Sequence, residues 1–104
     1  MTGDTRMIIH LIRSGGFGGM RREVRIETGS LSREEREPLE GLVQASGFFS
    51  LPGKFPKPGK GADYFTYSIT VDDGERHHTV EVAEPSLPEG LRPLIREVSK
   101  RLKA

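Results

Sequence analysis

The side chains best suited to binding a metal ion are three histidines, His10, His77 and His78. His77 and His78 are neighbours in a stretch that predicts a strand, so their side chains point to opposite faces of the sheet and cannot hold one ion together. We expect His78 to face inward with a hydrogen-bond partner, for which Tyr67 is a candidate, and His77 to be solvated. The sequence therefore predicts no metal site.

Residues for nucleophilic or acid–base catalysis are also missing from the sequence. It contains no cysteine, and Ser14, Ser30 and Ser32 have no base at a recognisable motif spacing. Asp72 and Asp73 precede a glycine, as is typical of a tight turn rather than of an acid–base pair. We predict that the protein is not an enzyme and uses no cofactor.

The most unusual local feature is the segment Ser-Gly-Gly-Phe-Gly-Gly at residues 14–19, in which four glycines surround Phe17. It joins two predicted strands, whereas phosphate-binding glycine loops lead into a helix, so it is weak support for a nucleotide site. Ordering so many glycines costs conformational entropy that some contact should offset. Two interpretations stay open: Phe17 folds back over the core of a bulged hairpin, or the hairpin presents Phe17 to a partner.

The overall charge excludes binding that rests on a strong field. Sixteen Lys and Arg against fifteen Asp and Glu give a net charge of +1, so we expect neither nucleic acid nor a membrane as partner. Lys54, Lys57 and Lys60 lie in a Pro- and Gly-rich stretch, residues 52–62, that predicts a solvated surface loop. The apolar stretch near the N-terminus is too short for a signal core or a membrane span, so we expect a cytoplasmic protein.

Alternating residues predict four strands. Residues 6–13 carry apolar side chains on both faces, as in a well-covered strand, and residues 20–28 alternate charged with apolar side chains, as in a half-exposed one. These two should form a hairpin. Residues 63–71 and 76–83 flank an Asp-Asp-Gly turn and predict a second hairpin, with Tyr67, His78 and their alternate neighbours inward.

Two helices complete the pattern. Ser32 and Glu35 have the spacing of a capping box, and Gly47 is a plausible stop. Pro38 implies either a kink or a regular helix that begins near it. Apolar residues recur at helical spacing from Leu91 to Leu102. The fold class predicted is α+β: a two-layer ββαββα domain, with a four-stranded antiparallel sheet and both helices on one face, over residues 1–104 as one domain with residues 1–5 flexible.

At these residues the sequence resembles the emfourin family. The family pattern runs from a first strand into Arg-Ser-Gly-Gly-Phe-Ala-Gly followed by an arginine, and residues 13–19 with Arg22 match it except for Gly18, where alanine is frequent. A second block, Asp-x-Phe-x-Tyr, matches residues 63–67, and Arg76 with His78 matches the next strand. A leucine-rich helix closes the pattern, so the likeness covers about residues 6 to 102.

The resemblance implies a small cytoplasmic bacterial inhibitor of protealysin and related thermolysin-like zinc metallopeptidases, which blocks the active-site cleft. Separately, we expect the free protein to be a monomer. From the resemblance we expect residues 14–19 to enter the cleft, with Phe17 in the pocket for a large apolar side chain. Whether Ser14, a main-chain carbonyl or the N-terminal amine reaches the zinc stays open. The expected peptidase-binding residues are Arg13, Ser14, Gly15, Gly16, Phe17, Gly18, Gly19 and Arg22.

Other readings of the same residues also stay open. Arg13 and Arg22 either orient the loop and contact acidic groups of the peptidase, or pair with strand neighbours such as Glu23. We assign Asp63, Tyr67 and His78 to the scaffold. The alternative function is a non-enzymatic interaction module that binds a peptide at a sheet edge.

Overall fold

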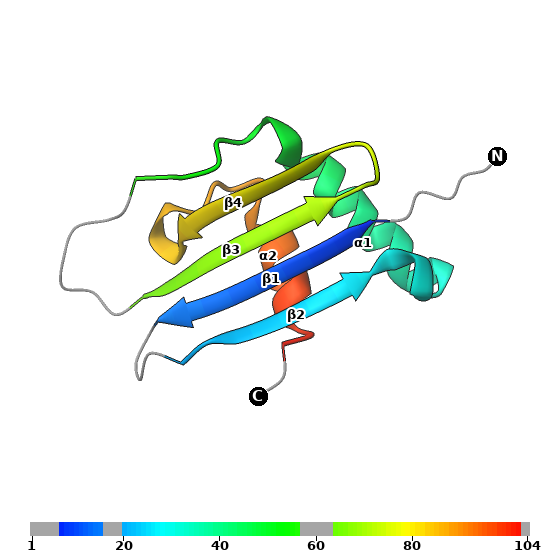
Figure 1. Cartoon of the computed structure of the whole chain (residues 1–104), viewed down its shortest axis with the longest axis horizontal. Helices are drawn as coiled ribbons and strands as arrows, with labels where there is room; N and C mark the ends of the chain where they lie inside the picture. The colour runs from blue at the N-terminus through cyan, green and yellow to red at the C-terminus, as the bar shows by residue number, and fades with distance from the viewer. Residues whose placement is uncertain (1–6, 16–19, 57–63, 103–104) are drawn as a thin grey trace.

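The computed structural model describes residues 7–15, 20–56 and 64–102, which form one antiparallel sheet with two helices on one of its faces (Figure 1). The strand order is β2-β1-β3-β4, so β1 and β3 are central. This confirms the predicted α+β fold and its ββαββα order. The elements are β1 (Ile8–Gly15), β2 (Arg22–Glu27), α1 (Arg33–Ser46), β3 (Phe65–Asp72), β4 (His77–Ala83) and α2 (Arg92–Ser99), with short 3-10 turns at Thr28–Ser30, Phe48–Ser50 and Glu84–Ser86.

The core lies between the sheet and the two helices. Alternate residues of the two central strands are fully buried there, as the period of two requires. Each helix contributes one apolar stripe, and α2 in particular buries residues at spacings of one, three and four. The buried residues that the layers share include Ile9, Leu11, Ile69, Val71, Val80, Leu39, Val43, Leu94, Ile95 and Val98.

The face of the sheet away from the helices is open. Ile8, His10 and Ile12 lie on this face and are only half-buried, so the expectation that the first strand is well covered is wrong for one of its sides. Its neighbours there are polar: His10 lies between Arg25 and Thr70 in the register, and its Nε2 contacts a carboxylate oxygen of β2 at 3.2 Å. In the described residues, polar neighbours on this face thus take the place of a second helical layer.

The first helix begins and ends where its capping residues predict. The Ser32 side chain accepts a hydrogen bond from the Glu35 amide at 3.2 Å, and Gly47 adopts the left-handed conformation, φ 63°. The helix begins at Arg33 and continues past Pro38, so a start near the proline is wrong. Among the residues that the structure describes, no helix has the length and hydropathy to span a bilayer.

Residues 52–62 were predicted to form a solvated loop, and for residues 53–55 this is wrong. Residues 57–62 lie outside the described residues. Gly53 and Phe55 bond to Glu81 through their backbones, at 2.8 and 3.2 Å, so this part of the linker covers the outer edge of β4. His78 also finds its partner here. Its Nε2 lies 2.6 Å from the carbonyl oxygen of Leu51, so the expected bond to Tyr67 is wrong.

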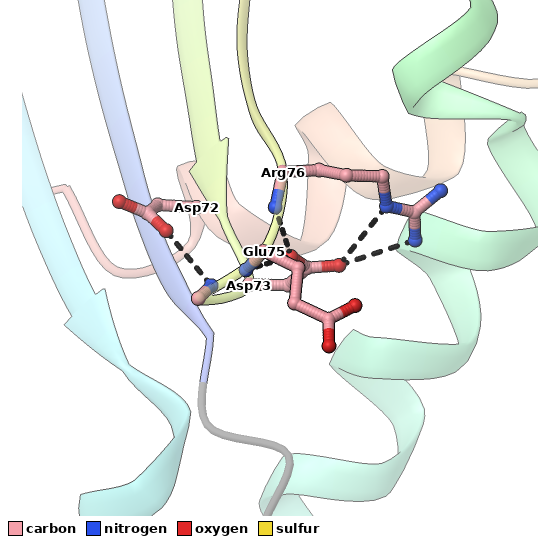
Figure 2. A network of polar contacts seen from close by, with 5 residues as sticks. Asp72, Asp73, Glu75 and Arg76 are labelled. Atoms are coloured by element: carbon pink, nitrogen blue, oxygen red, sulfur yellow. Dashed lines mark hydrogen bonds and ion pairs between the residues drawn. The ribbon is translucent and has the colours of Figure 1, made fainter.

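The turn between β3 and β4 is held by two carboxylates, of which Asp72 accepts one bond, from the Gly74 amide at 2.9 Å, and Asp73 accepts four (Figure 2). Asp73 Oδ1 accepts bonds from the amides of Glu75 and Arg76 at 2.9 and 2.7 Å, and Oδ2 accepts two from the Arg76 guanidinium at 3.3 and 3.1 Å. The Arg76 guanidinium also lies over the ring of Phe49, 4.1 Å from its centre. The Arg76 amide is the main reason that the pKa of Asp73 lies below its usual value.

We expect Asp73→Asn to destabilise the fold by about 1–2 kcal/mol at neutral pH, because charge-assisted bonds become neutral ones. Since the folded state lowers the pKa of Asp73, its contribution is full above the unfolded pKa of about 3.9 and is lost as the pH falls through the folded pKa. Urea unfolding at several pH values measures both effects. Glu75→Gln is the control, and an equal loss in both variants, or a loss in Asp73→Asn that does not shrink in acid, would contradict the assignment.

Candidate functional site

The ends of the Gly-rich segment are fixed by the sheet. β1 and β2 pair as far as Arg13 opposite Arg22, while on its other side β1 stays paired with β3 up to Gly15 opposite Phe65. The predicted end of the first strand at Arg13 is therefore two residues early. The connection from β1 to β2 is much longer than a two-residue turn. Both of its ends are attached to paired strands at the same end of the sheet.

Gly15 is required by the backbone at this point. Its φ is +87°, a region that side chains rarely adopt, and an added Cβ would lie 2.9 Å from the carbonyl oxygen of Tyr64. Glycine at this position therefore permits β1 to pair with β3 up to its last residue. Gly16, Phe17, Gly18 and Gly19 lie outside the described residues, and their predicted roles stay predictions.

Arg13 lies on the side of the sheet that faces the helices. Its guanidinium sits over the ring of Phe65, 4.4 Å from the centre, and bonds to the Tyr67 side chain. The expected alternative partner, Glu23, instead contacts His10 and Arg21, each at 3.2 Å. Arg13 is thus held by aromatic residues of β3 at the start of the Gly-rich segment.

The other predicted residues divide between the two faces. Arg22 is opposite Arg13 in the register and therefore on the same face, and its Nη2 lies 3.9 Å from the sulfur of Met20. The Met20 side chain is the large apolar one that the described residues expose most, at 57%. Ser14 lies on the open face, opposite Thr66. The structure thus brings Arg13 and Arg22 together and separates Ser14 from them.

A cleft of about 380 Å³ opens beside Arg13, between the sheet and α2. We call it the basic cleft. The sequence analysis did not predict it, because it considered only the apolar residues of the last helix. Their spacing of four was the available signal, since it places them on one helix face. The charged residues that line the cleft with Tyr67 are Arg13, Glu84, Arg92, Arg96 and Lys100.

Tyr67 forms part of the wall of the basic cleft and keeps its proton at neutral pH. Burial is the main reason that the pKa of Tyr67 is raised above 10.0, and the Glu84 carboxylate raises it further, while the charge and hydrogen bond of Arg13 lower it. Its hydroxyl is therefore a neutral hydrogen-bonding group next to a fixed guanidinium. The scaffold role that we assigned to Tyr67 stays a prediction.

The described residues contain no group of three or more His, Cys, Asp or Glu side chains that could hold a metal ion. What they do contain is a rigid sheet end, an exposed apolar side chain and a charged cleft. These features lie in an α+β fold, at and beside the end of the sheet from which the Gly-rich segment leaves.

Comparison with known proteins identifies the family. The chain belongs to the Emfourin family, whose sequence pattern matches residues 11–99. No curated protein sequence matches it at a significant level. A similar solved structure is emfourin (M4in) from Serratia proteamaculans, named as an M4 family peptidase inhibitor. It is 17% identical, covers 100% of this chain and 96% of its own, and has a TM-score of 0.50, which supports the fold.

Emfourin is a family of inhibitors, which confirms the prediction that the chain is not an enzyme.

We expect Gly15→Ala to destabilise the protein by about 1–3 kcal/mol, because alanine is strained at positive φ and its Cβ meets the Tyr64 carbonyl. The matched control is Gly41→Ala in α1, where an added Cβ meets nothing within 4 Å. That change should stabilise the helix by about 0.5–1 kcal/mol. Denaturant unfolding of both variants is the measurement, and a neutral Gly15→Ala would show that the end of β1 is not held as described.

Alkaline titration followed by phenolate absorbance should show Tyr67 ionising above 10.0. Arg13→Ala should raise this pKa further and Glu84→Gln should lower it, because each removes a charge that acts in the opposite direction. Since the folded pKa is raised, the Tyr67 hydroxyl contributes stability below the unfolded pKa of about 10, and this is lost as the pH rises through the folded pKa. Opposite signs for the two variants would refute the arrangement.

Proposed function

We propose that this protein inhibits thermolysin-like zinc metallopeptidases of the M4 family by placing the hairpin between β1 and β2 in their active-site cleft. Membership of the Emfourin family supports peptidase inhibition, and the similar Serratia structure is named as an inhibitor of M4 family peptidases. The partner proposed is therefore a peptidase, bound by one copy of this chain in the cytoplasm. The peptidase performs the chemistry, and the inhibitor only occupies the cleft.

The observation that carries this proposal is the way in which the sheet holds both ends of the Gly-rich segment. Gly15 is bonded to β3, and Arg22 is bonded to β1 opposite Arg13. A segment tethered at both ends loses less conformational entropy on binding than a free peptide does. Main-chain groups of such a segment can pair with an enzyme as an extended substrate does.

An inhibitor that enters the cleft must also avoid being cut, and the same constraint serves this requirement. A peptidase cuts a peptide bond that is aligned with its catalytic groups within a small tolerance. Glycines permit backbone angles that a substrate does not adopt at the cleaved bond, and the paired strands hold the two ends of the segment in place, which limits its alignment with the catalytic groups. In this proposal Phe17 fills the pocket for a large apolar side chain, and its glycine neighbours let the enzyme surface approach closely.

The alternative function is peptide binding along a sheet edge. β2 is an outer strand of the sheet, whereas the outer edge of β4 is covered at residues 53–55. A partner strand would therefore add to β2, not to β4. Substitutions in the Gly-rich segment would then leave binding unchanged, which distinguishes the two functions.

We expect Phe17→Ala to weaken inhibition of a thermolysin-like peptidase by about 2 kcal/mol or more, a factor of roughly thirty, because an apolar side chain that fills a pocket is typical of binding hot spots. The inhibition constant, measured with a fluorogenic peptide substrate, gives this number. Phe17→Leu should retain most of the affinity, since leucine is also large and apolar.

Met20→Ala is the matched control, because Met20 is an exposed apolar side chain of the same hairpin. It should cost less than about 1 kcal/mol, the range of ordinary interface positions. If Phe17→Ala also stays below that value, Phe17 is not the side chain that fills the pocket. If Met20→Ala has the larger effect, Met20 fills the pocket in its place.

A further inference from the structure

The basic cleft is adjacent to the segment that we propose as the inhibitory hairpin. Arg13 contributes to both, because it forms part of the cleft wall and precedes Gly15 by two residues. At about 3.3 Å per residue of strand, the two backbone positions are roughly 7 Å apart. A partner that binds the hairpin therefore brings its surface to the mouth of the cleft.

The cleft concentrates positive charge in a nearly neutral protein. The whole chain carries +1, yet four cationic side chains and a single carboxylate, Glu84, line this cleft. Lys100 is in part neutralised by Glu97, at 3.4 Å. Arg92 and Arg96 form no ion pair or side-chain hydrogen bond with any residue in the described part of the chain, and both are exposed.

The cationic groups of the cleft differ in how firmly they are held, and their guanidinium groups suit a planar anion. Arg13 is fixed by the Phe65 ring and the Tyr67 side chain. Arg92 and Arg96 project from one face of α2, one turn apart. Guanidinium groups present two parallel N–H donors that match the two oxygens of a carboxylate.

We propose that the basic cleft is a second contact with the peptidase and takes acidic side chains, Asp or Glu, from the rim of the active-site cleft. This inference rests on the proposed function. Arg13 provides the fixed donor, and Arg92 with Arg96 attracts the acidic surface and offers further donors to it. The Gly-rich hairpin then supplies affinity in the cleft, while the basic cleft increases the rate of association and sets the orientation.

The same residues do not form a nucleic-acid site. Binding of single strands needs exposed aromatic faces on which bases stack. Tyr67, which lines the cleft, is only 6% exposed, and the neighbouring Phe65 ring is covered by Arg13. Side-chain carboxylates need no stacking surface, so they fit the cleft better.

The test is a charge reversal that leaves the hairpin intact. In Arg92→Glu with Arg96→Glu, both side chains are exposed, so the fold is expected to persist, and thermal unfolding checks this. At low ionic strength we expect the association rate with a thermolysin-like peptidase to fall tenfold or more. The wild-type rate should decrease steeply with added sodium chloride, and the rate of the variant should not.

The control is Arg33→Glu with Arg36→Glu at the start of α1, which changes the net charge by the same amount at the opposite end of the sheet (Figure 1). Its association rate should stay within about twofold of the wild-type rate. Equal rates and equal salt dependence in the two variants would overturn the proposal. The proposal would also be wrong if the cleft binds small anions instead of the peptidase. In that case sulfate would stabilise the wild type but not the Arg92/Arg96 variant, and inhibition by the variant would be unchanged.

This experiment separates the failure of the two proposals. If the wild-type protein does not inhibit the peptidase at any salt concentration, the proposed function is wrong. If the wild type inhibits and the Arg92/Arg96 variant behaves like the control, inhibition stands and only the second contact is wrong.

Discussion

The structure depends on the pairing of β1 with strands on both of its sides. β2 holds it as far as Arg13, and β3 holds it to Gly15, where the positive φ and the close Tyr64 carbonyl leave room only for glycine. Because β1 is paired on both sides and buried on one face, a shift of its register by one residue would move all of its buried apolar side chains to the open face. The position at which the Gly-rich segment leaves the sheet is therefore fixed by the core.

Much of this fold is predictable from sequence because its signals are local. The alternation in β3, the Ser32 and Glu35 pair and Gly47 each act within a few residues, and the structure has them as predicted. Non-local contacts were not predictable in the same way. The His78 partner, Leu51, is 27 positions away, and the cover over the β4 edge comes from a linker that reads as an ordinary Pro- and Gly-rich loop.

The candidate site shows the same division. The Gly-rich motif and its arginines identify the family, but the sequence does not reveal that Arg13 faces the helices and lies over Phe65. That placement follows from strand register, and only the register brings Arg13 next to the arginines of α2. The cleft is assembled from β1, β3 and α2, so the sequence offers only one local indication of it. This is the spacing of four between basic residues of the last helix.

The most direct test of the central claim is hydrogen exchange of the inhibitor alone and in complex with a thermolysin-like peptidase. The account predicts that amides of residues 14–22 become strongly protected in the complex, while those of β4 and of α1 exchange as in the free protein. Unchanged exchange at residues 14–22, with new protection along another surface, would contradict it.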